Sequence, residues 1–488
     1  MRYIPHTEAD VRAMLATIGV PTVDALFDSI PAALQLGRPL EVPSAMAESD
    51  LRSHLRDLAD RNVAMSRAVS FLGGGVYRHY APVAVSQLLL RGEIYTAYTP
   101  YQPEIAQGTL QIIFEFQTLV SELIGAEVVN ASMYDGSTAL AEAALMAMRV
   151  SSSNSPARHA RPRSPDEAGL KAAEEGATTD PRVVAANSQR ILLSRALHPQ
   201  WREVTRVFVE SAGGTIVDID VGRDGRTDLA HVERELEAGA AAVVLGYPSF
   251  FGTFDDVAGG RVLCDKHGAL LVASFQEAAA FGLITPPGEL GADIIAGEGQ
   301  SLGVPASFGG PHLGLFGTRE KYLRQMPGRL AGETVDSRGN RGFVLTMSTR
   351  EQHIRREKAT SNICTNVALM ATASTIAMTL LGPNGLATVA RASHLRTEET
   401  KEKVTRLPGF ALYFADSPTF NEFVLRTPKP AATYVDALAP RKIAPGIALG
   451  AFAKELGDPG LEHALLIAAT ELTTEADIDA LAAGLASV

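Results

Sequence analysis

Cysteine is scarce in this chain. Only Cys264 and Cys364 are present, far apart in the sequence. Two isolated cysteines can form neither a disulfide framework nor a Cys-X-X-Cys metal site. Because proteins with so few cysteines are typical of reducing compartments, we expect a cytoplasmic protein and assign it no metal site.

Positive charge is also in short supply. The chain has 44 Lys and Arg against 55 Asp and Glu, which gives a net charge of -11. Since a nucleic-acid-binding surface needs clustered cations, we expect no nucleic-acid ligand. The N-terminal sequence MRYIPHTEADVRAML has charges among its apolar residues, so it lacks the apolar segment of a signal peptide.

A long apolar run is missing as well. Residues 359–390 carry no charge, but nine Thr, Ser and Asn residues interrupt the first two thirds of this stretch. A membrane span needs about 20 predominantly apolar residues. We therefore expect no membrane span. The stretch instead predicts a loop followed by a helix that is buried from all sides and ends at Gly382-Pro383.

The 488 residues are 46% hydrophobic and are enough for two or three domains. Residues 1–60 predict a helical arm, with a capping box at Thr7 and Asp10. Residues 61–330 predict a large α/β domain, because short apolar strands alternate with helices from Ile191 onward. Residues 331–488 predict a C-terminal region that includes a small α+β domain.

One segment, residues 151–186, has a different composition. It is rich in Ser, Pro, Arg and Ala and has almost no large apolar side chain. Such a segment cannot bury enough surface to offset the entropy of ordering. We interpret it as a disordered surface insertion, with a regulatory or binding segment as the alternative.

An α/β domain followed by a smaller α+β domain is typical of PLP-dependent transferases of the aspartate aminotransferase type, fold type I. PLP chemistry needs an anion cradle at a helix N-terminus, a carboxylate for the pyridinium and a lysine for the Schiff base. Gly136 to Thr138 open an Ala-rich helix and are candidates for the cradle, although an ordinary helix cap is the alternative.

The carboxylate and the lysine are missing from their usual places. The strand ALLVASF is followed by Gln276, and the nearest acid is Glu277. The strand ADIIAGEG is followed by Gln300 and Ser301, where a lysine is expected. A serine cannot form an imine, so the chain has a PLP-type fold without its own PLP chemistry. The triple-glycine segment GGGVYRHYAP at 73–82 is no dinucleotide fingerprint, and we predict a tight turn or a close backbone approach there.

Several long runs resemble one family, the glycine decarboxylase P-proteins of the glycine cleavage system, and specifically their N-terminal-half subunit. The runs that carry the resemblance are FLGGGVYRHYAP, EIYTAYTPYQPEIAQGTLQ, SRALHPQWREV, GADIIAGEGQSLGVPASFGGPHLGLFGT and PGRLAGETVDSRGNRGFVLTMSTREQHIRREKATSNICTN. They cover most of the chain in the family's order, and the insertion at 151–186 departs from the family's pattern.

The resemblance implies a division of labour between two subunits. Subunit 2 would carry the lysine and the PLP, so none is covalently bound to this chain. The two subunits would form an α2β2 heterotetramer with the active site between them. The complex would remove carbon dioxide from glycine and pass the aminomethyl group to the lipoyl arm of the H-protein.

The resemblance also suggests roles for three segments. Tyr95, Tyr98, Thr99, Tyr101 and Gln102 are candidate catalytic residues that line a channel for glycine and the lipoyl arm; packing of a Pro-rich loop is the alternative. Ser307, Gly309 and Gly310 are candidates to reach the PLP phosphate of the partner subunit, unless they form a plain turn. The cationic run of Arg350, His353, Arg355, Arg356 and Lys358 is a candidate for binding a carboxylate, the H-protein or the partner; a solvated helix face is the alternative.

Two other functions stay open from the sequence. The chain could be a stand-alone PLP enzyme that uses an unconventional lysine such as Lys358. It could also be a non-catalytic scaffold or binding module on a PLP-enzyme fold.

Overall fold

A computed structural model of the chain describes residues 5–154 and 189–488, in two compact units, Met1–Val63 and Ala64–Val488. The first unit contains the helices α1 (Glu8–Ile18) and α2 (Glu48–Ala59), neither of which buries a residue. The predicted capping box is confirmed, since the Thr7 hydroxyl accepts from the Asp10 amide and the Asp10 carboxylate accepts from the Thr7 amide. Both helices lie within the predicted arm.

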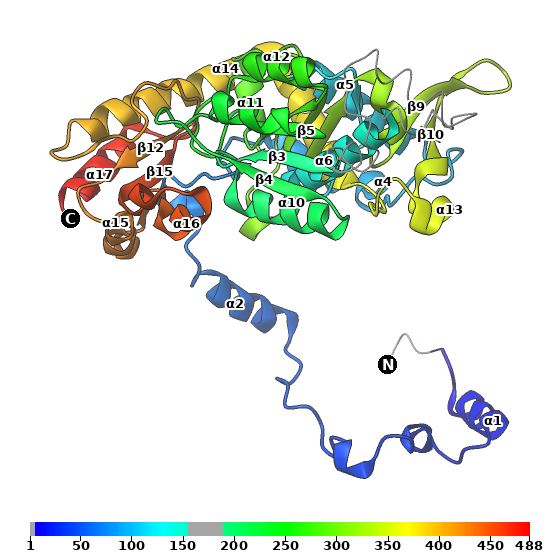
Figure 1. The fold of residues 1–488 in the computed structure, drawn as a ribbon. Helices are drawn as coiled ribbons and strands as arrows, with labels where there is room; N and C mark the ends of the chain where they lie inside the picture. Colours follow the sequence, from blue (N-terminus) through cyan, green and yellow to red (C-terminus); the bar gives the residue numbers. More distant parts are fainter. Residues whose placement is uncertain (1–4, 155–188) are drawn as a thin grey trace, which may run out of the picture. The chain divides into compact units, whose positions relative to one another are not determined.

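The second unit is built around a seven-stranded sheet of order β2-β8-β7-β6-β5-β3-β4. Its strands are β2 (Val128–Val129), β3 (Arg190–Ser194), β4 (Thr215–Ile219), β5 (Ala242–Gly246), β6 (Leu270–Phe275), β7 (Ile294–Glu298) and β8 (Gly314–Thr318). Its strands β3, β4 and β5 are labelled in Figure 1. The five strands β3 to β7 are parallel, and β8 runs antiparallel to both β7 and β2. The predicted α/β domain therefore contains a largely parallel sheet, as the alternation of strands and helices indicates.

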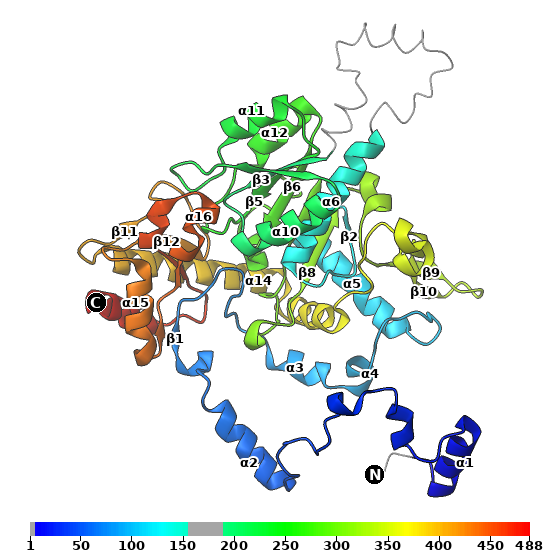
Figure 2. The same ribbon diagram turned by 60° about the horizontal axis from the view of Figure 1, so that its bottom comes forward.

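Helices cover both faces of this sheet because its strands are apolar on both sides. Along β3, Ile191 and Leu193 pack against α6 (Gly136–Asn154) and α10 (Pro199–Ser211), whereas Leu192 packs on the opposite face. The helices α11 (Leu229–Glu237) and α12 (Val257–His267) cover that opposite face (Figure 2). The parallel strands thus end at one edge of the sheet, which is where ligands bind in such folds.

A smaller antiparallel sheet of order β11-β12-β15-β14 follows in the sequence. Its strands are β11 (Ala411–Leu412), β12 (Glu422–Arg426), β14 (Ile447–Ala448) and β15 (Ala464–Ala468). The helices α15 (Ala431–Leu438) and α17 (Glu475–Ala486) pack on it, and Thr474 forms a capping box with Asp477 at the start of α17. The short strand β1 (Val69–Ser70) pairs with β13 (Ile443–Ala444), which anchors the start of the unit to this region.

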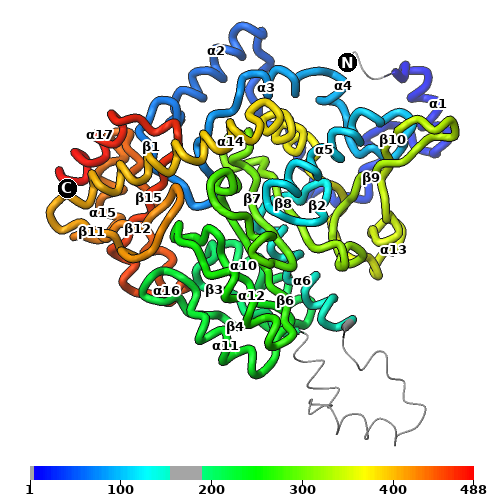
Figure 3. The backbone as a smooth tube through the Cα atoms, turned by 90° about the horizontal axis from the view of Figure 1, so that it is seen from above, coloured from blue at the N-terminus to red at the C-terminus, as the bar shows by residue number. Residues whose placement is uncertain are grey.

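The uncharged stretch differs from the prediction. The helix α14 (Ala368–Thr405) does not end at Gly382-Pro383 but kinks there, where Gly382 takes a φ of 60°. Proline is compatible with the first turn of a helix, so a new helical segment starts at once. The helix runs beside α5 (Gln107–Ile124) and reaches the smaller sheet (Figure 3). Residues 371–378 are mostly buried, but Leu380 is exposed, so burial from all sides holds only for the middle of the stretch.

Two predicted boundaries can be compared with the structure, the start of the insertion at 151 and the end of the large domain at 330. The helix α6 continues to Asn154, four residues into the predicted insertion at 151–186, and the rest of that insertion lies outside the described residues. The hairpin of β9 (Leu330–Val335) and β10 (Arg341–Thr346) spans the predicted boundary at 331 and packs against α5. The division into a large and a small domain at 331 stays a prediction. None of the helices in the described ranges is long and apolar enough to cross a membrane.

Candidate active site

The first candidate feature is the N-terminus of α6, the predicted anion cradle. The Asp135 carboxylate accepts hydrogen bonds from the Thr138 amide and the Ser137 hydroxyl, both at 2.7 Å. The Glu298 carboxylate at the end of β7 accepts from the Gly136 amide at 2.9 Å, and burial raises the pKa of Glu298 to about 8. The chain's own acids therefore occupy the Gly136 and Thr138 amides, which favours the alternative interpretation of an ordinary capped helix.

The space in front of this helix end is filled as well. A β-carbon added to Gly136 would lie 2.3 Å from the Trp201 ring. This contact means that the helix start is packed against α10 and is not open to a ligand.

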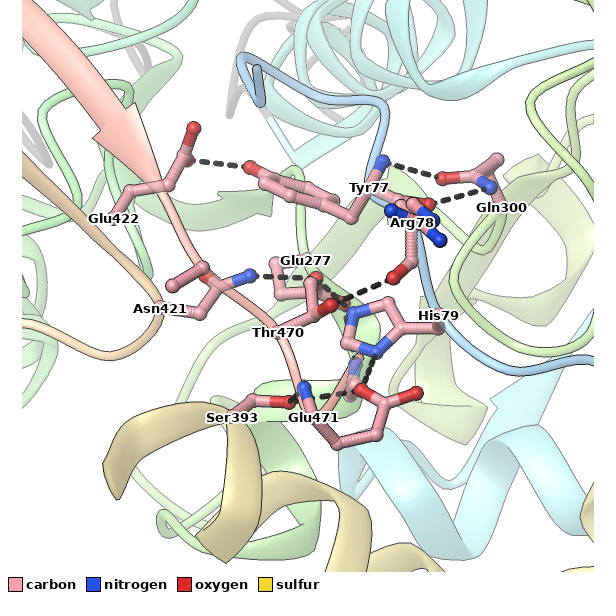
Figure 4. Close-up of polar contacts among 12 residues, drawn as sticks. Tyr77, Arg78, His79, Glu277, Gln300, Ser393, Asn421, Glu422, Thr470 and Glu471 are labelled. Carbon is pink, nitrogen blue, oxygen red and sulfur yellow. Dashed lines mark hydrogen bonds and ion pairs between the residues drawn. The ribbon is translucent and has the colours of Figure 1, made fainter. Parts of the chain in front are cut away.

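The second feature is the triple-glycine loop, which makes the predicted close backbone approach. It leads into Tyr77, which is labelled in Figure 4. The Gly74 amide donates to Glu422 on β12 at 2.6 Å, and the Tyr77 hydroxyl donates to the same carboxylate at 2.5 Å. A β-carbon on Gly73 would lie 2.2 Å from that carboxylate. Burial raises the pKa of Glu422 to about 7, and the nearby Glu277 adds to the shift.

The same loop covers the end of β7, where a Schiff-base lysine is expected. The Gln300 side chain accepts from the Tyr77 amide at 2.8 Å and donates to the Tyr77 carbonyl at 3.1 Å. Gly75 lies against Gln276 and His198, with an added β-carbon 3.8 to 4.0 Å from both. The loop therefore lies over the strand ends at which PLP chemistry would take place.

At the centre of Figure 4, His79 lies between two carboxylates. Its Nε2 lies 2.9 Å from Glu277 and its Nδ1 lies 2.7 Å from Glu471, and the side chain is only 4% exposed. Burial alone would lower the pKa of His79, but attraction to the two carboxylates outweighs it and raises the pKa to about 10. Asn421 and Ser393 donate to the same two carboxylates. Glu277 is thus fully engaged and is not available to a pyridinium.

These residues do not fit PLP. Gln300 and Ser301 follow β7 in place of a lysine, Glu277 is paired with His79, and α6 is capped by Asp135 and Glu298. A Schiff base needs an amine at the end of β7. Among the described residues, this edge of the sheet therefore offers no amine with which PLP could form a Schiff base.

A second constellation contains several of the predicted site residues. The Arg329 guanidinium donates to the Tyr101 hydroxyl at 3.1 Å and to the Cys364 carbonyl at 2.6 Å. The Thr99 and Thr365 hydroxyls lie 2.9 Å apart. The His353 ring lies 6.3 Å from the Tyr101 ring, and Glu351 lies 3.5 Å from His353. The fold thus brings together Thr99, Tyr101 and His353, which are far apart in the sequence.

The other predicted residues lie in different surroundings. Tyr95, Tyr98 and Gln102 are exposed and make no side-chain hydrogen bond within the described ranges. The turn at Ser307 to Gly310 is a run of positive φ angles with Phe308 at its tip, 99% exposed. Neither set is hydrogen-bonded to the Tyr101 constellation within the part of the chain that the structure describes, so their roles stay predictions.

The cationic run divides into two parts. Arg350 is buried and donates to the carbonyls of Met326 and Gly328, so it braces the segment before β9. The Arg355 Nε donates to the Thr349 carbonyl, whereas Arg356 and Lys358 are exposed and have no ion-pair partner among the described residues. Only the second part is placed to meet another molecule.

Comparison with known proteins assigns the family. The model of the glycine cleavage system P-protein family matches residues 1–158 and 166–485. The chain belongs to this family. Residues 159–165, which the family model skips, lie inside the predicted insertion.

Relatives of full length agree with this P-protein assignment. The chain is 47% identical to the probable glycine dehydrogenase (decarboxylating) subunit 1 of Rhodospirillum centenum, over 100% of both chains. It is 43% identical to the protein of the same name from Brevibacillus brevis, over 100% of this chain and 99% of that one. The predicted resemblance is therefore confirmed.

Solved structures confirm the fold class. A crystal structure of glycine decarboxylase (P-protein) of the glycine cleavage system, in inhibitor-bound form, matches with a TM-score of 0.81 and 39% identity over 100% of both chains. A sphingosine-1-phosphate lyase from Burkholderia pseudomallei shares the fold alone, with a TM-score of 0.62 and 15% identity over 94% of each chain. The predicted PLP-dependent transferase fold thus holds for this P-protein.

Sequence reasoning missed several residues of these two constellations, among them His79, Glu422, Arg329 and Glu351. Each lies in a segment with no local pattern for its role, and their partners are 22 to 392 residues away. The signal available in the sequence was the match to the P-protein family, because His79, Arg329 and Glu351 all lie inside the matching runs.

Proposed function

We propose that this chain is subunit 1 of a two-subunit glycine decarboxylase, and that a second subunit provides the lysine and the PLP. Together they would remove carbon dioxide from glycine and transfer the aminomethyl group to the lipoyl arm of the H-protein. The full-length relatives that are named subunit 1 support this division. A cytoplasmic α2β2 heterotetramer is the assembly that we propose.

One observation carries the proposal. The position after β7 holds Gln300 and Ser301 in place of a lysine, and the triple-glycine loop and two carboxylates fill the space around it. A P-protein chain without this lysine would need a companion that supplies the lysine and the PLP. The Tyr101 constellation and the segment around it are then the part of this chain that faces the shared site.

Each predicted segment has a place in this proposal. Tyr95, Tyr98, Thr99, Tyr101 and Gln102 would line the path of glycine and the lipoyl arm. Ser307, Gly309 and Gly310 would approach the phosphate of the partner's PLP, because glycines allow a close backbone approach. Arg355, Arg356 and Lys358 would attract an acidic surface of the H-protein or of subunit 2.

The test is an exchange assay between glycine and labelled carbon dioxide. We expect no exchange and no visible imine absorbance from the purified chain with added PLP, and exchange when subunit 2 and lipoylated H-protein are present. An active isolated chain would contradict the proposal, and borohydride reduction followed by peptide mapping would show whether Lys358 or another lysine had bound PLP. Exchange by subunit 2 and H-protein without this chain would instead favour a scaffold.

A further inference from the structure

Arg329 lies beneath Tyr101 in a position that none of the sequence patterns indicated. It precedes β9, is 2% exposed, and its carbonyl accepts from the Ala131 amide, so the fold fixes both its backbone and its side chain. Tyr101 lies in the loop after α4 (Gly92–Tyr95) and is 54% exposed. The guanidinium carbon lies 4.8 Å from the centre of the Tyr101 ring. A buried cation therefore supports an exposed phenol.

The chemistry of arginine fixes the direction of this hydrogen bond. A guanidinium can only donate, so the Tyr101 oxygen must accept. The same Nη2 atom also donates to the Cys364 carbonyl, and this second bond holds the guanidinium in place. Within residues 5–154 and 189–488 no acceptor takes the Tyr101 hydroxyl proton. That proton is free to be donated to a molecule that contacts the exposed side of the ring.

The charges around Arg329 indicate which kind of hydrogen-bond acceptor that molecule should present to Tyr101. Glu351 lies 3.6 Å from Arg329, but one of its oxygens has no hydrogen-bond partner among the described residues, and neither have Nε and Nη1 of Arg329. The hydrogen-bonding capacity of this buried ion pair is therefore not used up within the pair. A phenol that accepts from a cation is a stronger donor, and such donors are matched best by anionic acceptors.

We propose that Arg329 is a positioning residue that holds Tyr101 as an outward hydrogen-bond donor to an anionic oxygen of the bound substrate. This inference rests on the proposed function, because the substrate lies in the site shared with subunit 2. Arg329 itself is covered and acts through Tyr101. Tyr101 then does more than line a channel: it orients the charged end of the substrate.

If Arg329 had a purely structural role, its loss and the loss of the Tyr101 hydroxyl would act independently. A double-mutant cycle in the reconstituted complex distinguishes this from our inference. We expect Tyr101→Phe to lower kcat/KM for glycine about 10- to 100-fold, as for loss of a hydrogen bond to a charged group. Arg329→Lys should cost a similar factor. The double variant should be no worse than Tyr101→Phe alone, because Arg329 acts through the phenol.

Arg341→Lys is the matched control, since Arg341 also stacks on an aromatic ring, 5.0 Å from Phe343, but lies exposed on β10. It should leave kcat/KM unchanged. The inference would be overturned if the fold-losses in kcat/KM of the two single variants multiplied in the double variant. It would also be overturned if Tyr101→Phe left kcat/KM unchanged. Tyr101→Phe keeps the aromatic ring of an exposed residue and does not disturb the core. It therefore tests the donor role of Tyr101 even if Arg329→Lys unfolds the protein. A wild-type complex without exchange activity would contradict the proposed function first, and this inference with it.

Discussion

The two ion pairs of His79, with Glu277 and Glu471, lead to a quantitative prediction of how the stability of the protein depends on pH. An ordinary histidine has a pKa of about 6.5, whereas His79 is raised to about 10 in the folded protein. Because the folded pKa is the higher one, the stabilisation is complete below about pH 6.5 and is lost as the pH rises toward 10. By linkage, this contribution is about 4 to 5 kcal/mol at pH 6 and about 1 to 2 kcal/mol at pH 9.

Replacing the ring with a neutral amide, as in His79→Gln, leaves two buried carboxylates facing each other without a cation. Loss of one partner of a buried ion pair costs about 3 to 5 kcal/mol, which agrees with the value from the pKa. We therefore expect the free energy of unfolding of the variant to be lower than that of the wild type by this amount at pH 6. The wild type itself should lose about 3 kcal/mol of the His79 contribution between pH 6 and pH 9.

Urea unfolding at pH 6, 7, 8 and 9, followed by the fluorescence of Trp201, the single tryptophan, measures this difference. His231→Gln is the control, because His231 pairs with Asp220 and Glu235 nearer the surface and should cost less than about 1 kcal/mol. A variant with the same free energy of unfolding as the wild type at pH 6 would show that His79 is not held as a cation.

Single substitutions and labelling at three other places give further expected outcomes. Ser301→Lys alone should give no visible imine absorbance with PLP, because Asp135 and Glu298 still cap α6; a trapped phosphopyridoxyl group at position 301 would show that the capped helix does not keep PLP out. Alkylation of the native chain should modify Cys364 and spare Cys264, since Cys364 is exposed while burial raises the pKa of Cys264 to about 12; mass spectrometry of the digested protein reads this out, and equal labelling would refute it. Leu425→Ala should lower the free energy of unfolding by about 3 kcal/mol, because Leu425 is fully buried in the smaller sheet; Leu90→Ala, at an exposed leucine, should change it by less than about 0.5 kcal/mol.

The elements with a strong local pattern could be predicted from the sequence. The strands of the parallel sheet are short apolar runs between helices, and the caps at Thr7 and Thr474 depend on side chains three residues away. Local interactions decide such features, so they are visible in the sequence. The kink at Gly382 was missed because the same Gly-Pro pair can end one helix and begin the next.

The site was only partly predictable for a physical reason. Tyr101 and His353 were found as members of dense segments, but Arg329, which donates to the Tyr101 hydroxyl, is a single arginine before a strand. Likewise, the capping of α6 by Glu298 joins positions 162 residues apart. Contacts of this length come from the tertiary fold, and no spacing within one segment encodes them.

The backbone pairing at Phe71 has a consequence for synthesis of the protein. The Phe71 amide donates to Ala444, and its carbonyl accepts from Ala468, so this early residue is stitched into the last sixth of the chain. Because the ribosome releases the N-terminus first, the backbone of residues 69–71 must wait, unpaired, until nearly all of the polypeptide has emerged. Compaction of the unit is then completed late in translation, and nascent chains truncated before residue 444 should leave this segment open to proteases and chaperones.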